Sequence, residues 1–216
     1  MCFSAPASFA GAAIISAIGV AAQTKVSKRA QRLFAVIPFL FGFQQLAEGV
    51  LWVTLGSASY PVLQDIVTYI FLVTALVIWP VMVPLSVRMM EEVKIRKKIL
   101  TALLVSGCLL SAVYAFCLAY YDVFPQINSF HIEYIYNVPQ TLMTVAFVFY
   151  LITTIAPFFV SSVRRMWVFG ALIAVSCIVT GIFFSQFLTS VWCFFAAFIS
   201  IIIYWILHGV KSKSAG

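Results

Sequence analysis

One polar cluster in this sequence lies where acid–base or binding chemistry could occur. Glu48 stands inside the apolar stretch FGFQQLAEGVLW, together with Gln44 and Gln45. At the angular spacing of a helix, these three side chains share an arc of about 100° with Phe41 and Trp52. Two amides, one carboxyl group and an indole therefore face one direction. A carboxyl group in such surroundings could exchange a proton or hold a cation or a polar ligand.

Two interpretations of Glu48 follow from its position in an apolar run. A carboxyl group is costly in a membrane, so we expect Glu48 to face the bundle interior or a wet cavity. In the first interpretation Glu48 is neutral, is hydrogen-bonded to Gln44 or to another helix, and only joins helices. In the second it belongs to a ligand, proton or ion site. Three clustered polar side chains exceed what one helix contact needs, and Gly42 and Gly49 beside them permit a close neighbouring helix.

Partners for this cluster must come from other apolar runs or from the loops. His131 lies near Glu133 in the longest polar stretch, and it could fold over the Glu48 cavity as a proton shuttle or metal ligand. The alternative for His131 is an interfacial polar residue, which is also our interpretation of His208. The other candidates carry polar atoms near the same half of the membrane: Tyr69, Tyr114, Gln140, Thr144, Ser185, Gln186 and Trp192.

No metal or cofactor site is predicted from the histidines and cysteines. The two histidines fall on opposite sides of the membrane, so they cannot jointly bind zinc or haem. The five cysteines have no CxxC spacing, and we interpret them as small apolar packing residues. Three of them, Cys2, Cys117 and Cys193, fall near the same side, and a disulfide between two of these three is left open.

The composition indicates the class of protein that must position these residues. Of the 216 residues, 64% are hydrophobic and 9% are charged. A chain this apolar cannot cover a water-facing surface, so we predict an integral membrane protein whose partner is the lipid bilayer. The net charge of +7 does not indicate nucleic-acid binding, because the basic residues form short clusters between apolar runs.

Seven apolar runs predict an all-α bundle of seven transmembrane helices that forms a single domain of residues 1–216. Pro80 and Pro84 predict a kink near the end of the third helix. The predicted helices are approximately residues 5–22, 33–55, 66–87, 99–120, 138–160, 166–185 and 191–208.

The basic residues predict the orientation of this bundle. With seven helices, every one of the thirteen Lys and Arg residues falls on one side, and Asp65, Asp122 and Glu133 fall on the other. Positively charged loops are retained in the cytoplasm. We therefore expect an outside N-terminus and a cytoplasmic C-terminus, in a bacterial cytoplasmic membrane.

Three stretches of the chain resemble a family of small bacterial membrane proteins of unassigned function: MCFSAPASF, IPFLFGFQQLAEGVLW and SVWCFFAAFIS. The resemblance spans most of the chain. It implies a multi-helix membrane protein and no particular reaction. It also implies the motif residues Cys2, Gln44, Gln45, Glu48, Trp52, Trp192 and Cys193.

The leading functional hypothesis is a non-enzymatic membrane protein that binds or moves a small solute, a proton or a lipid through an outward-facing polar pocket around Glu48. One alternative is a membrane-embedded lipid-modifying enzyme that uses Glu48 and His131. A receptor-like or scaffold protein is the other. The absence of an acid–base–nucleophile constellation in the sequence favours the first hypothesis. The candidate ligand-binding residues are Gln44, Gln45, Glu48, Trp52, His131 and Trp192.

The orientation gives the first testable prediction. In a variant whose native cysteines are replaced by serine, single cysteines are introduced at Ser57 and at Ser214, and intact cells receive an impermeant thiol reagent. We expect labelling at position 57 and protection at position 214, because only the former faces outward. Labelling at position 214 alone would reverse the predicted orientation.

Overall fold

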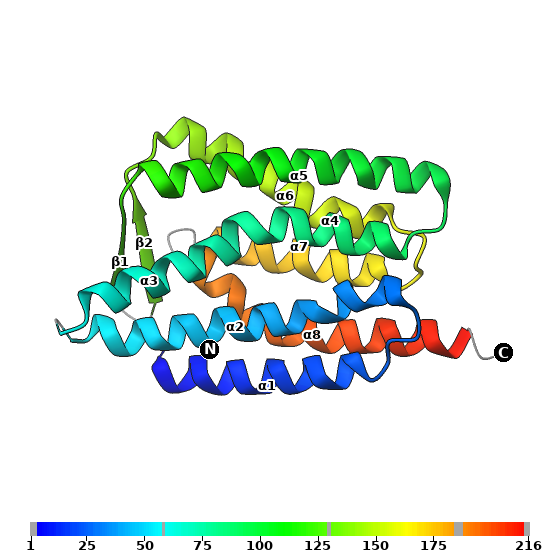
Figure 1. The fold of residues 1–216 in the computed structure, drawn as a ribbon, viewed down its shortest axis with the longest axis horizontal. Coiled ribbons are helices and arrows are strands. Elements are labelled where there is room, and N and C mark those ends of the chain that lie inside the picture. The colour runs from blue at the N-terminus through cyan, green and yellow to red at the C-terminus, as the bar shows by residue number, and fades with distance from the viewer. Residues whose placement is uncertain (1–3, 58, 129–130, 184–187, 214–216) are drawn as a thin grey trace.

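The described part of the chain forms seven helices, one of which consists of two α-helical segments joined end to end. The helices run roughly along one axis (Figure 1). The computed structural model describes residues 4–213 except for residues 58, 129–130 and 184–187. Among the described residues, six helices are long and apolar enough to cross a membrane. The predicted fold class is confirmed, and the apolar helices mark the chain as an integral membrane protein.

The bounds of the helices differ from the predicted ones mainly where polar residues extend a helix beyond the hydrocarbon region. The third crossing begins at Pro61 instead of residue 66, and the fourth begins at Lys94 instead of residue 99. Proline is favoured at the first position of a helix, which explains the earlier start at Pro61. The predicted end at residue 185 lies outside the described residues. The helices are α1 (Ala5–Gln23), α2 (Arg32–Leu55), α3 (Pro61–Leu72), α4 (Trp79–Met90), α5 (Lys94–Tyr120), α6 (Gln140–Val160), α7 (Met166–Phe183) and α8 (Leu188–Lys213).

A π-helical segment, η2 (Val73–Ile78), joins α3 to α4 into one membrane crossing. The irregularity therefore lies before Pro80, and not at the cytoplasmic end where a kink was predicted. Pro80 has no N–H, so the Ala75 carbonyl five residues earlier lacks the donor that a π-helical pattern would supply. The Tyr150 hydroxyl of α6 donates to this carbonyl at 2.8 Å instead. The Ser111 hydroxyl of α5 donates to the Val77 carbonyl at 2.7 Å, so both helices are held against the segment.

A β-hairpin lies at one end of the bundle, where the sequence analysis expected a polar loop (Figure 1). Its strands β1 (Val123–Asn128) and β2 (His131–Tyr136) are antiparallel, with Val123 opposite Tyr136. Glu133 accepts hydrogen bonds at 3.1 Å from the side chains of Gln126 and Asn128. The stretch HIEYIY is rich in strand-forming residues, which explains the second strand.

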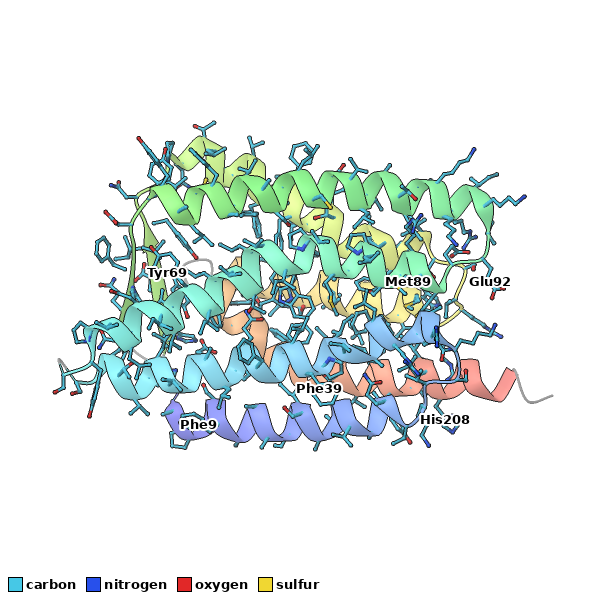
Figure 2. The ribbon with its side chains drawn as sticks, viewed as in Figure 1. Phe9, Phe39, Tyr69, Met89, Glu92 and His208 are labelled. Carbon is cyan, nitrogen blue, oxygen red and sulfur yellow. The ribbon has the colours of Figure 1, made fainter. Side chains whose placement is uncertain are left out.

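The turns and helix ends at the opposite end of the bundle carry the basic residues. Figure 1 shows the α1–α2, α4–α5 and α6–α7 connections and the end of α8 at this end. Figure 2 shows Glu92 and His208 there as well, with Phe9 toward the other end. Lys28 and Glu92 form an exposed ion pair at 3.4 Å. An exposed ion pair in water contributes little stability.

A buried carboxylate also lies at the basic end, and the sequence analysis did not identify it. Glu91 follows α4 and is 1% exposed. Its carboxylate accepts hydrogen bonds from the Ser162 backbone N–H at 2.6 Å, the Ser162 hydroxyl at 2.7 Å and the Val93 N–H at 2.8 Å. Burial raises the pKa of Glu91, but these hydrogen bonds outweigh burial and hold the pKa below its usual value. Glu91 thus joins the α4–α5 turn to the α6–α7 turn.

We predict that Glu91→Gln lowers the free energy of unfolding by about 1–3 kcal/mol, because an amide nitrogen cannot accept the hydrogen bonds that a carboxylate oxygen accepts. The folded-state pKa is depressed, so this stabilisation is complete at neutral pH and is lost as the pH falls through that pKa. Thermal melting between pH 7 and pH 3 tests both statements, with the exposed neighbour substitution Glu92→Gln as the matched control. Equal melting of Glu91→Gln and Glu92→Gln at pH 7 would contradict this role for Glu91.

Candidate functional site

A cavity of about 740 Å³ lies between the helices below the β-hairpin. Its described walls are largely aromatic, and they are contributed by α2, η2, α4, α5, α6, α7, α8 and β2. The ten aromatic residues are Phe41, Trp79, Tyr114, Tyr134, Tyr136, Phe147, Tyr150, Phe158, Phe169 and Trp192. The polar atoms of the wall are few, as in sites that enclose a small organic ligand.

Gln44 is the most deeply buried amide of the cavity wall, with 3% of its surface exposed. The Trp79 indole N–H donates to the Gln44 side-chain oxygen at 3.1 Å. Phe41 stacks on the Trp79 ring with 4.3 Å between centroids, which holds the indole in place. Because an indole nitrogen can only donate, the Gln44 amide oxygen faces Trp79 and its nitrogen remains a donor.

Three further aromatic rings form the opposite part of the wall. The rings of Tyr114 and Tyr150 meet edge to face at 6.2 Å, and those of Tyr150 and Trp192 meet edge to face at 6.0 Å. The hydroxyl of Tyr150 is the one that donates to the Ala75 carbonyl of η2. The π-helical segment therefore fixes the position of one wall of the cavity.

The β-hairpin covers the cavity at the end that was predicted to face outward. Ile132, Tyr134 and Tyr136 of β2 line the cavity. Tyr134 stacks on Phe71 of α3 with 5.1 Å between ring centroids, which attaches the hairpin to the bundle. His131 at the start of β2 is 7% exposed, and burial lowers its pKa.

Gln45 and Glu48 are completely buried on α2, and they face helices instead of lipid. The Gln45 amide nitrogen donates to the Glu48 carboxyl at 3.1 Å. The close approach of α1 explains their burial: Gly42 contacts Ser16, and a Cβ on Gly49 would lie 2.8 Å from the Phe9 ring. A stripe of small residues allows two helices to pack this closely in lipid.

The structure separates the six candidate ligand-binding residues into two groups. Gln44 and Trp192 line the cavity. The described wall does not include the other four candidates, which are Gln45, Glu48, Trp52 and His131. A role in ligand binding stays a prediction for all six residues. Tyr114, Gln140 and Thr144, which were weighed as partners, do line the cavity.

Several residues of the wall were missed, although some had a signal in the sequence. Trp79 was read only as part of an apolar run, and its contact with Gln44 joins residues far apart in the chain. Tyr134 and Tyr136 alternate with Glu133 and Ile135, a period-two pattern that predicts a strand. Tyr150 is a hydroxyl-bearing residue in the middle of an apolar run, which is itself a signal for a buried hydrogen bond.

The described cysteines give no thiol pair. Cys108, Cys117 and Cys177 are free, and Cys117 and Cys177 are buried. Cys2 and the side chain of Cys193, which belong to the disulfide pairings that the sequence leaves open, lie outside the described residues. No group of three His, Cys, Asp or Glu side chains within the described ranges is arranged to hold a metal ion.

Comparison with known proteins identifies a family without a known activity. A family model described as "Family of unknown function (DUF6629)" matches residues 1–215. No curated protein and no solved structure matches the chain. The whole-chain match agrees with the resemblance to an uncharacterised family of membrane proteins.

The contact between Gln45 and Glu48 predicts different effects for two substitutions at position 48. Glu48→Gln preserves an acceptor for the Gln45 amide, so we expect little change in melting temperature. Glu48→Leu leaves the buried Gln45 donor without this acceptor and should cost about 1–3 kcal/mol of stability. Thermal unfolding of the purified protein in detergent measures both effects. A Glu48→Leu variant as stable as the Glu48→Gln variant would show that this hydrogen bond does not stabilise the bundle.

Proposed function

We propose a function from the geometry of the cavity, because this chain belongs to the DUF6629 family, whose function is not known. The protein is a non-enzymatic membrane protein that binds a small ligand inside its helical bundle and passes it across or along the membrane. The site is centred on Gln44 and not on Glu48, which was the centre expected from the sequence. Gln45 and Glu48 lie buried on α2 beside this site, with the Gln45 amide donating to the Glu48 carboxyl.

The size and lining of the cavity carry this proposal. A volume of about 740 Å³ falls in the range of sites that enclose a small organic molecule, about 300–1,000 Å³. A bundle that served only as a scaffold would gain stability by filling this space with side chains, because a cavity forfeits packing contacts. The oriented amide of Gln44 gives the cavity one well-defined polar point.

The orientation expected from the basic residues places the hairpin and the cavity on the outer side of a bacterial cytoplasmic membrane. All thirteen Lys and Arg residues are at the other end, where the positive-inside rule favours the cytoplasm. A ligand would therefore reach the cavity from the outer side or from the outer leaflet.

The two alternative functions have less support. In a lipid-modifying enzyme that uses Glu48 and His131, the substrate must touch both side chains, and neither lines the cavity. In a receptor or scaffold, the cavity would contribute to function only if a ligand inside it changed the packing of the helices. Binding of a ligand is common to the leading function and to a receptor, so it is the property to test first.

Filling the cavity should abolish binding. Ala75 lines the cavity and is 5% exposed, so Ala75→Phe places a ring inside it. The probe is N-phenyl-1-naphthylamine, an uncharged aromatic fluorophore, which accepts excitation energy from Trp79 and Trp192 in the cavity wall. We expect saturable binding to the wild type in detergent and at least about tenfold weaker binding to Ala75→Phe, about 1.4 kcal/mol.

The matched control for this experiment is Ala102→Phe, which adds the same ring to the exposed surface of α5. We expect Ala102→Phe to bind the probe as the wild type does. Melting temperatures of both variants establish that they are folded. Equal affinity of folded Ala75→Phe and Ala102→Phe for the probe would contradict a binding site in this cavity.

A further inference from the structure

We infer, on the basis of the proposed function, that the ligand is an uncharged, membrane-soluble ring compound that accepts hydrogen bonds through a carbonyl group, the chemical class of the quinones. Three features of the cavity support this inference: the absence of charge in its described wall, the donors it presents, and the position of its opening.

The described wall of the cavity carries no Asp, Glu, Lys, Arg or His side chain. An ion in a low-dielectric site without a partner of opposite charge costs several kcal/mol, so a charged ligand would be rejected. The basic residues that could bind a phosphate or a carboxylate lie at the other end of the bundle. This argues against a phospholipid headgroup or a fatty-acid anion in the cavity.

Two polar groups beside the aromatic rings of the wall, Gln44 and Tyr114, present donors. The Gln44 oxygen is used by Trp79, so the Gln44 nitrogen is the atom that a ligand would meet. Among the described residues, the Tyr114 hydroxyl has no hydrogen-bond partner, while the Tyr150 hydroxyl is already donating to Ala75. A ligand that presents carbonyl oxygens satisfies Gln44 and Tyr114, whereas a pure hydrocarbon leaves both without a bond.

The aromatic walls select for a flat ring. Phe41 and Trp79 stack beside Gln44, and Tyr114 and Tyr150 meet edge to face on the facing helices. Aromatic rings pair favourably with another ring in offset or edge-to-face arrangements. An electron-poor ring such as a quinone would lie against these electron-rich faces with its carbonyl groups toward the donors.

We place the opening of the cavity in the lipid-facing surface between α6 and α7, because the exposed residues of its described wall lie on these two helices. Its exposed lining residues are Gln140 and Thr144 of α6 and Gly181 of α7. The neighbouring Val145 and Ile182 are exposed and apolar, as expected of residues in contact with acyl chains. A Cβ on Gly181 would meet no atom within 4 Å. A ligand dissolved in the outer leaflet can therefore reach the cavity without crossing the hairpin.

The test is displacement of N-phenyl-1-naphthylamine from the full-length protein in detergent by a short-chain ubiquinone. The matched competitor is a prenylbenzene of the same length without carbonyl groups, and the charged competitor is oleate. We expect the quinone to displace the probe from the wild type at a concentration at least about tenfold lower than either competitor needs. Gln44→Leu and Tyr114→Phe should each raise the quinone concentration needed by about tenfold relative to the prenylbenzene concentration needed in the same variant.

The outcomes separate this inference from the proposed function. If the probe binds saturably but the quinone is no better than the prenylbenzene, the ligand class is wrong and the cavity remains a binding site. If the probe does not bind saturably, the proposed function fails. If Gln44→Leu proves unstable because Trp79 loses its acceptor, Tyr114→Phe alone decides the role of the donors. An unchanged quinone affinity in folded Tyr114→Phe would then overturn the inference that donors in the wall bind the carbonyl groups of the ligand.

The position of the opening is tested by the rate of quinone binding. Gly181→Phe places a ring in the opening, whereas the neighbour substitution Ile182→Phe only enlarges an exposed lipid-facing side chain. We expect about tenfold slower association in Gly181→Phe and no change in Ile182→Phe. Equal association rates in these two variants would contradict a lateral opening between α6 and α7.

Discussion

The hydrogen bond from the Tyr150 hydroxyl to the Ala75 carbonyl determines how the bundle is arranged around its cavity. In lipid, a carbonyl that Pro80 deprives of its helical donor must find another one, because no water is present to replace it. Tyr150 supplies that donor from α6, and its ring lies in the cavity wall. The Ser111 hydroxyl of α5 donates to the nearby Val77 carbonyl and holds α5 against the same segment. The hydrogen bond from Tyr150 therefore joins the helix irregularity before Pro80 to one wall of the cavity, which both Tyr150 and Ala75 line.

The two buried glutamates stabilise the regions on either side of this arrangement. Glu48 accepts from Gln45 on the face of α2 that packs near α1, where Gly42 and Gly49 allow the close approach. Glu91 accepts from Ser162 and joins the two turns at the basic end. Each carboxyl group is buried with hydrogen-bond donors, as the cost of burying a polar group requires. Neither borders the cavity, so the middle of the bundle remains uncharged.

The sequence predicted the features that depend on local composition, and it failed where contacts between distant segments decide. Long apolar runs predicted the seven helices, and the clusters of Lys and Arg between them predicted that all thirteen basic residues lie at one end. Helical periodicity placed Gln44 and Glu48 on one face of α2, but periodicity gives a direction and not a neighbour. Trp79 and the close packing of α1 decide that Gln44 borders the cavity while Glu48 does not. The hairpin was missed because its aromatic residues also suit a membrane interface.

The central claim is that the cavity bounded by Gln44, Tyr114 and Trp192 holds a ligand. The most direct measurement is an experimental structure of the protein extracted from its native membrane into lipid nanodiscs without added ligand. We expect density for an uncharged molecule inside the cavity, with a polar atom within hydrogen-bonding distance of the Gln44 amide nitrogen. A cavity that has collapsed, so that side chains of α6 and α8 occupy the space beside Gln44, would contradict the claim.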